Sequence, residues 1–501
     1  MKHTFGEYIE LLKKNDVILE VKDVEGRLDR EVSYISYNSR DIIKDTLFVC
    51  KGVHFEPKYL EDAIKAGALA YVSEKEYETV NSDVPVILVN DMRKTLALIA
   101  NFYYENVSEK LNTVGITGTK GKSTTTYFTR AIFDDYLSAE KKPLSAVLSG
   151  IDNYDGVINE ESHLTTPETF ELHKSFNNAV NSGIEYLTME VSSQSLKYHR
   201  VMGVTYKVGC FLNIGTDHIS DREHKDFNDY FQSKLKLFGQ CKTACVNLDC
   251  DHATEVLERA KSSDVVERVI AFSTEDESAD VYGYDISSKD GHVFFRVKTK
   301  EFDEEFEIGL PGVFNVSNAL AAIANTWALG VPVEYMKSGL KRARVSGRME
   351  VYSKDGKYVI VDYAHNKLSF ETLFKAMKKE FPGKKLHIVF GCPGKKAYAR
   401  RQELGELAGE YCDRVYITEE DAGEEDVLEI SKEIESYVKK FDCKEEIITD
   451  RVEAIEKAID EIDSDTVLLI TGKGRETRQK RGTEYIPTPS DVEVVTKKLG
   501  L

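Results

Sequence analysis

The chain has 501 residues, 41% hydrophobic and 31% charged, with a formal net charge of −19. This length suggests about three domains of a soluble globular protein. The negative charge disfavours non-specific nucleic-acid binding, although a local basic pocket could still bind small anions.

No apolar run is long enough to span a bilayer, and the N-terminus lacks the apolar core of a signal peptide. We therefore expect a cytoplasmic protein with reduced thiols and no membrane span. Cys241, Cys245 and Cys250 cluster in sequence without paired Cys-x-x-Cys spacing. A structural zinc site there is the less favoured alternative to ordinary thiols.

The first block, residues 1–107, mixes short helices and strands. Apolar spacing predicts an amphipathic helix over 1–14 and a second helix over 57–68, opened by Pro57. Buried strands are predicted at 46–52 and 84–90.

The second block, residues 108–343, opens with a β-branched strand, a glycine-rich turn and an apolar-periodic helix. The predicted elements are strands at 113–118, 184–191, 208–214 and 243–248 and a helix at 125–137.

The third block, residues 344–501, alternates strands with helices. The predicted strands are 357–365, 386–391, 414–421 and 466–474, and the predicted helices are 368–381 and 401–411. Such alternation predicts a parallel sheet covered on both faces. The acidic stretch 418–430 is interpreted as a solvated helix start, where carboxylates favour the positive end of the helix dipole.

The turn "GITGTKGKSTTT", residues 115–126, resembles a phosphate-binding loop but departs from the P-loop signature, because Ile116 replaces the first glycine. A strand, a glycine-rich turn and a helix in this order aim backbone N–H groups and the positive helix end at a phosphate. Gly118 and Gly121 permit close approach, Lys122 can reach the β and γ phosphates, and Ser123 can take a Mg²⁺ position. We therefore predict nucleotide binding; a simple surface turn is the alternative.

Further motifs extend the resemblance along nearly the whole chain. They are "YNSRDIIKDTLFVCKG", "HLTTPETFELH", "MEVSSQSLKYHRV", "FLNIGTDHISDREH", "DYFQSKLKLF", "GVFNVSNALAA", "GRMEV", "VIVDYAHN" and "LLITGKGRET". In this order they resemble the Mur ligases, in particular the UDP-N-acetylmuramoyl-tripeptide synthetase type. The resemblance implies an α/β fold with three domains. These would be a UDP-sugar-binding domain (1–107), a central ATP-binding domain with a P-loop ATPase-like parallel sheet (108–343), and an amino-acid-binding domain resembling dinucleotide-binding folds (344–501).

The resemblance also implies the reaction. ATP phosphorylates a carboxylate of UDP-N-acetylmuramoyl-dipeptide, and the amine of a free amino acid attacks the resulting acyl phosphate. Such a site must neutralise several negative charges, which calls for lysines, a helix N-terminus and Mg²⁺. The implied catalytic residues are Lys122, Glu190, His218 and Lys234. The implied metal ligands are Ser123, Glu190, His218 and Lys234, the last as a CO₂-derived carbamate.

Without the resemblance, the local sequence predicts simpler structural roles for two of these residues. Lys234 reads as a helix-surface lysine, and Glu190, after an apolar run, could equally be a cap at a strand end. Two further sets follow from the resemblance. The nucleotide set is Gly118, Thr119, Lys120, Gly121, Lys122, Ser123, Thr124, Asn315, Asn318, Arg348, Asp362 and His365. The UDP-sugar-peptide set is Ser39, Arg40, Thr165, Thr166, Ser192, Tyr198 and Arg200. Asn38 and Tyr198 depart from the family pattern, which usually has Asp and often Gln at these positions.

The predicted amino-acid-binding residues are Arg401, Glu420, Asp421, Gly472 and Glu476. Relatives that add meso-diaminopimelate carry an arginine where this chain has Gly423, within an acidic stretch. Such a stretch would repel a distal carboxylate and attract an ammonium group, which favours L-lysine. Meso-diaminopimelate, with Arg475 as the carboxylate ligand, and ornithine stay open as alternatives. A folylpolyglutamate synthase and a nucleotide-binding module without ligase activity are the competing classes, and a monomer is expected.

Overall fold

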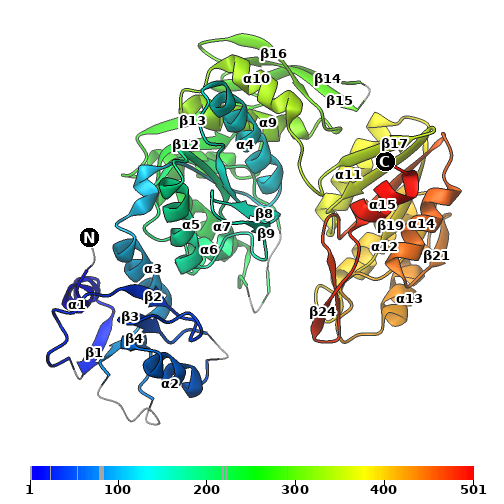
Figure 1. Cartoon of the computed structure of the whole chain (residues 1–501). Helices are drawn as coiled ribbons and strands as arrows, with labels where there is room; N and C mark the ends of the chain where they lie inside the picture. The colour runs from blue at the N-terminus through cyan, green and yellow to red at the C-terminus, as the bar shows by residue number, and fades with distance from the viewer. Residues whose placement is uncertain are drawn as a thin grey trace. The chain divides into compact units, whose positions relative to one another are not determined.

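The computed structural model describes residues 3–22, 24–52, 55–77, 84–216, 219–220, 223–289 and 291–501. The chain forms two compact units, whose helices and strands are labelled in Figure 1. The first unit comprises Met1–Tyr282, Lys298–Phe302 and Leu320–Gly339, and the second comprises Gly283–Val297, Asp303–Ala319 and Leu340–Leu501. The three-domain boundaries expected after residues 107 and 343 stay predictions. No helix in the described part of the chain is long and apolar enough to cross a membrane.

A five-stranded sheet of order β1-β5-β4-β3-β2 forms the N-terminal region. Its elements are α1 (Phe5–Lys14), β1 (Ile18–Lys22), β2 (Tyr34–Ser36), β3 (Thr46–Val49), α2 (Pro57–Lys65), β4 (Ala68–Ser73), β5 (Val86–Val89) and α3 (Met92–Tyr103). Thr4 and Glu7 form a capping box that starts α1. Both predicted helices and both predicted strands are confirmed. The second helix ends earlier than expected, because Gly67, with φ of +109°, turns the chain into β4.

An eleven-stranded sheet of order β16-β15-β14-β13-β12-β11-β6-β10-β7-β8-β9 follows. Its strands are β6 (Asn112–Thr117), β7 (Ala146–Leu148), β8 (Asp152–Tyr154), β9 (Asn159–Glu161), β10 (Tyr186–Glu190), β11 (Tyr206–Phe211), β12 (Cys241–Asn247), β13 (Arg268–Ser273), β14 (Val281–Lys289), β15 (His292–Lys298) and β16 (Asp303–Ile308). The helices of this region are η1 (Val107–Lys110), α4 (Lys122–Ala139), α5 (Thr169–Asn181), α6 (Ser193–Lys197), α7 (Phe227–Leu235), η2 (Lys236–Gly239), α8 (Ala253–Lys261), α9 (Asn315–Ala328) and α10 (Val333–Arg342).

The strands from β7 to β14 through β10, β6, β11, β12 and β13 pair in parallel, whereas β8 and β9 add an antiparallel edge. From β6 the chain crosses to β7 and β10 on one side and then returns to β11 on the other. The loop after β6 therefore lies at a topological switch point, where open α/β sheets bind their ligands.

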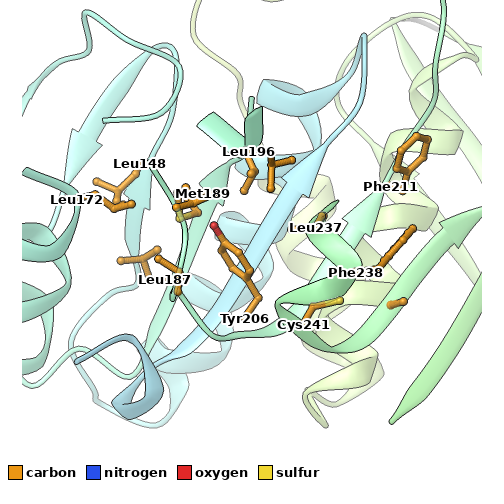
Figure 2. Packing of buried hydrophobic residues seen from close by; sticks show 14 of the residues in the cluster. Leu148, Leu172, Leu187, Met189, Leu196, Tyr206, Phe211, Leu237, Phe238 and Cys241 are labelled. Atoms are coloured by element: carbon orange, nitrogen blue, oxygen red, sulfur yellow. The ribbon is translucent and has the colours of Figure 1, made fainter. Parts of the chain in front are cut away.

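The core under this switch point explains one glycine of the phosphate-loop motif. Figure 2 shows Tyr206 within the buried cluster that includes Leu187, Met189 and Cys241. A Cβ on Gly115 would lie 2.7 Å from the Tyr206 ring. Gly115 therefore belongs to the buried part of β6, and the phosphate loop itself begins only after Thr117.

The C-terminal sheet has six strands in the order β17-β18-β22-β19-β20-β21, with a separate β23-β24 pair. The elements are β17 (Glu350–Lys354), β18 (Lys357–Asp362), α11 (Lys367–Glu380), β19 (Lys385–Phe390), α12 (Ala399–Tyr411), β20 (Arg414–Ile417), α13 (Val427–Val438), β21 (Lys444–Ile447), α14 (Arg451–Glu461), β22 (Thr466–Thr471), β23 (Arg478–Arg481), β24 (Glu484–Pro487) and α15 (Asp491–Leu499). All pairs except β17–β18 and β23–β24 are parallel. The predicted parallel α/β arrangement is confirmed.

Candidate active site

The phosphate loop connects β6 to α4, whose N-cap is Gly121 with φ of +82°. Asn213, which follows β11, holds this loop from the neighbouring strand. Its Oδ1 accepts the N–H groups of Thr119 (3.1 Å) and Lys120 (2.9 Å), and its Nδ2 donates to the Lys120 carbonyl (3.1 Å). Sequence reasoning missed Asn213; its place directly after a buried strand was the available signal.

Two lysine side chains converge on one carbonyl of this loop. Lys122 Nζ lies 3.0 Å from the Gly118 oxygen, and Lys234 Nζ lies 2.9 Å from the same atom. Lys234 is on α7 and is only 1% exposed, so the interpretation as a helix-surface lysine is wrong. Ser123 and Thr124 lie in the first turn of α4, where their N–H groups belong to the free helix end. The loop therefore concentrates positive charge, which suits a polyphosphate.

Glu190 ends β10 and pairs in register with Ile116 of β6, so its carboxylate lies at the same sheet edge as the phosphate loop. It is 2% exposed, and among the described residues its carboxylate accepts one hydrogen bond, from the Gly150 N–H (2.9 Å). A simple surface cap would not be buried in this way. A buried carboxylate with spare oxygen lone pairs fits a hard divalent cation such as Mg²⁺.

Thr166 links Glu190 to Arg200. The Thr166 hydroxyl donates to the Glu190 carbonyl (3.0 Å) and accepts the Ser192 N–H (3.0 Å), while Arg200 donates to the Thr166 carbonyl (3.2 Å). Thr165 lies nearby: a Cβ on Gly150 would be 3.6 Å from its Oγ1 and 3.7 Å from Glu190 Oε1. Five of the predicted residues, Thr165, Thr166, Glu190, Ser192 and Arg200, are thus brought together.

Ser39 and Arg40 follow β2 in a turn held by Asn38, whose side chain accepts the Arg40 N–H (3.1 Å). Asn38 therefore performs the turn-stabilising role that an aspartate can also perform. Tyr198 follows α6 and is covered by the guanidinium of Arg93, 3.8 Å from its ring centroid.

His218 lies outside the described residues. The same motif contributes His224, which is fully buried; its Nε2 lies 3.0 Å from Ser193 Oγ and its Nδ1 lies 3.3 Å from Asp229 Oδ2. His224 thereby fixes the segment before α7 against α6. No role for His224 was predicted from the sequence.

In the second unit, five predicted nucleotide residues fall into two groups, Asn315 with Asn318, and Arg348 with Asp362 and His365. Asn315 donates to the Pro311 carbonyl (2.9 Å) and accepts from Asn318 (3.1 Å). Around Tyr363, the Arg348 guanidinium lies 4.5 Å from the ring centroid and His365 Nδ1 lies 2.7 Å from the Tyr363 carbonyl oxygen.

Asp362 ends β18 in the same region. Its carboxylate accepts the N–H groups of Met349 (2.9 Å) and Ala364 (2.8 Å). It therefore orders the backbone directly after Arg348 and directly after Tyr363.

The predicted amino-acid-binding residues lie on loops at the carboxyl edge of the C-terminal sheet, and on α12. Arg401 is 5% exposed and forms ion pairs with Glu425 and Glu433 (2.7 Å), so it is not a solvent-facing helix arginine. Glu420 is also buried, and burial raises its pKa to about 7. Gly472 is required beside it, because a Cβ there would overlap the Glu420 carboxylate.

The acidic stretch is correctly placed before helix α13 but is not simply solvated. Glu419 is buried and pairs with Arg481 (2.6 Å). Lys473, missed by the sequence analysis, pairs with Asp421 (3.0 Å) and Glu476. The local charge is therefore less negative than the number of acidic residues in this stretch suggests. A lysine inside a glycine-rich loop after a strand was the available signal.

Comparisons with known proteins agree with this geometry. Residues 116–326 match the family model described as the Mur ligase middle domain, and residues 347–474 match the Mur ligase, glutamate ligase domain. The chain is 38% identical over 505 residues to a UDP-N-acetylmuramoyl-L-alanyl-D-glutamate--L-lysine ligase of Streptococcus pneumoniae, covering 98% of each chain. It is 34% identical to a UDP-N-acetylmuramyl-tripeptide synthetase of Lactobacillus acidophilus, covering 97% of this chain and 95% of that protein. The solved structure of a UDP-N-acetylmuramoyl-L-alanyl-D-glutamate--2,6-diaminopimelate ligase matches with a TM-score of 0.68 at 23% identity, covering 100% of this chain and 99% of that one.

Proposed function

Because the chain belongs to the Mur ligase family, whose members are ATP-dependent ligases that form amide bonds, we propose that it joins L-lysine to UDP-N-acetylmuramoyl-L-alanyl-D-glutamate. The product is a precursor of peptidoglycan, made in the cytoplasm by a monomer. The observation that carries the choice of amine is Gly423, which leaves the acidic loop after β20 without the arginine that would hold a distal carboxylate.

The phosphate loop would bind ATP through its N–H groups and Lys122. A carboxylate is a poor electrophile, so the enzyme must first bring it to the γ-phosphate. Thr165, Thr166, Ser192 and Arg200 would hold the sugar peptide for this transfer, and the lysine ammonium groups would neutralise the charge that builds up. Asn315, Asn318, Arg348, Asp362 and His365 are proposed to hold the remainder of the nucleotide.

Mur ligases use Mg²⁺, and the oxygen donors of this chain fit it. Ser123 and Glu190 would hold the metal, with His218 as a further ligand, and the ion would supply charge neutralisation for phosphoryl transfer. Lys234 is proposed to carry a carbamate. The support is its convergence with Lys122 on the Gly118 carbonyl, where two cations repel one another. An anionic carbamate would replace that repulsion with attraction.

For the incoming amino acid, Arg401 is proposed to bind the α-carboxylate, in exchange for one of its two glutamate partners. Asp421 and Glu476 already share one ammonium group, that of Lys473. Two carboxylates around one cation leave a net negative charge, which suits the side-chain ammonium of L-lysine. Meso-diaminopimelate and ornithine are the competing substrates.

The test is phosphate release with UDP-N-acetylmuramoyl-L-alanyl-D-glutamate across a panel of L-lysine, meso-diaminopimelate and ornithine. The expected result is turnover that requires the sugar peptide and is highest with L-lysine. Turnover that ignores both substrates would instead indicate a nucleotide-binding module, and turnover with a folate would indicate a folylpolyglutamate synthase.

Gly423→Arg should shift the preference towards meso-diaminopimelate. Gly423 has φ of +59°, so any side chain there is strained. Gly423→Ala is the matched control, because it adds the strain without the charge. Equal lysine preference in both variants would contradict the pocket assignment.

A further inference from the structure

Lys51 is a basic residue that none of the predicted sets contains. It follows β3, and its Nζ forms an ion pair with Glu168 and lies 4.4 Å from the centroid of the Tyr37 ring. Tyr37 in turn stacks on Phe170, with ring centroids 5.3 Å apart. Contacts from β2, β3 and the start of α5 therefore fix the ammonium group at a defined place.

Glu168 is shared between two cations. Besides Lys51, it binds Arg200, whose Nε lies 3.1 Å from Glu168 Oε1. The side chains are 25% (Lys51), 17% (Arg200) and 29% (Glu168) exposed, so solvent and solutes reach all three. Among these three side chains, one carboxylate faces two cations, so their charges sum to one positive charge. Among the described residues, the next carboxylate, Glu171, accepts a hydrogen bond from the neutral Tyr37 hydroxyl and forms no ion pair with Lys51 or Arg200.

This excess charge adjoins the proposed sugar-peptide residues. Arg200 donates to the Thr166 carbonyl, and the Thr166 hydroxyl contacts Glu190 and Ser192. A short chain of contacts thus connects Lys51 to the place where the reacting carboxylate is proposed to lie.

We propose that Lys51 is a further substrate-binding residue, which together with Arg200 binds an anionic group of the UDP-sugar peptide. The inference rests on the proposed function and adds a residue to it. In the free protein Glu168 holds both cations in position. A diphosphate or carboxylate oxygen of the substrate then provides the second negative charge that the pair of cations lacks. Charge-assisted contacts of this kind are among the strongest polar interactions in proteins.

The alternative is that the Lys51–Glu168 ion pair has a purely structural role and only stabilises the contact between two segments of the fold. Both roles make Lys51→Met lose an ion pair, but they differ in what else changes. If the role is purely structural, Lys51→Met lowers the melting temperature and leaves substrate affinity unchanged. A binding role lowers affinity for the anionic substrate, and Lys51→Arg retains most of that affinity.

The experiment is calorimetric titration of the full-length protein with UDP-N-acetylmuramoyl-L-alanyl-D-glutamate, without ATP or amino acid. Lys51→Met should weaken binding about tenfold, the loss expected for one charge-assisted contact. Lys22→Met is the matched control, because its Nζ forms a 2.7 Å ion pair with Glu76 in the same region at 32% exposure. It should bind within about twofold of the wild type.

A second titration with UDP-N-acetylglucosamine identifies the anion. A loss with both ligands assigns Lys51 to the diphosphate, and a loss with the dipeptide substrate alone assigns it to a carboxylate. Wild-type-like affinity of Lys51→Met for both ligands overturns the inference while leaving the proposed function intact. Absence of binding by the wild-type protein overturns both.

Discussion

A buried arginine connects the two loops proposed to bind the amino acid. Arg451 forms a bidentate pair with Asp491 (2.7 and 2.8 Å), and their side chains are 8% and 2% exposed. Arg451 also donates to the carbonyls of Glu419 (3.3 Å) and Thr471 (2.7 Å), and Asp491 accepts the Gly474 N–H (2.8 Å). Arg451→Met would leave the Asp491 charge buried and unpaired.

The cost of breaking such a buried pair is about 3–5 kcal/mol for either single change, Arg451→Met or Asp491→Asn. The double variant leaves no unpaired charge, so its cost should fall short of the sum by about 2 kcal/mol or more. Because the pair holds both loops, Arg451→Met should also raise the KM for L-lysine more than the KM for ATP.

Urea unfolding of the full-length chain, followed by hydrogen exchange in peptides from β20 and β22, measures the loss. Trp327, the single tryptophan, lies in the first unit, so its fluorescence transition should not move. Lys432→Met, which removes an exposed pair with Glu429, should cost less than about 1 kcal/mol. Additive costs in the double variant, or single costs below about 1 kcal/mol, would refute the reasoning.

Three further changes have defined outcomes. Burial raises the pKa of Glu420 to about 7, so the folded state binds its proton more readily than the unfolded chain and stability falls as pH rises from about 4.5 to 7. Glu420→Gln should flatten the melting temperature over that window, and an unchanged slope would contradict this. Burial lowers the pKa of His173 to about 4, so wild-type stability is lost as pH falls below about 6.5. Between pH 8 and pH 5 the wild type should therefore lose about 2 kcal/mol in urea unfolding that His173→Phe does not lose, and an equal loss in both proteins would contradict this. Lys234→Met should lower kcat at least about a hundredfold with little change in the KM for L-lysine, and carbon NMR after ¹³CO₂ labelling should show a carbamate signal only in the wild type.

The regular elements could be predicted because their signals are local. β6, the glycine-rich loop and α4 follow directly from a β-branched run, Gly118 and Gly121, and an apolar-periodic helix. Strands β14 to β16 were not predicted. β14 and β16 carry exposed polar side chains, and in β15 buried positions alternate with partly exposed ones, so none has the continuous buried run that marks the central strands.

The burial of charged residues could not be read from the sequence. Lys234 and Arg401 each occur in a polar helical stretch, yet both are buried, Lys234 against the Gly118 carbonyl and Arg401 against Glu425 and Glu433. Contacts between residues that are distant in sequence could not be predicted either. Asn213 contacts the phosphate loop from 93 residues away, and Lys473 contacts Asp421 across 52 residues.

Transfer of oxygen from the acid to phosphate tests the central claim most directly. With ¹⁸O in the γ-carboxylate of the D-glutamyl residue, ATP and L-lysine, each tripeptide formed should release one phosphate that carries one ¹⁸O atom. The reason is that the carboxylate oxygen attacks the γ-phosphate and later leaves with it. Unlabelled phosphate accompanying the new amide bond would contradict the acyl-phosphate route, and labelled ligation that proceeds equally well with meso-diaminopimelate in place of L-lysine would contradict the proposed amine.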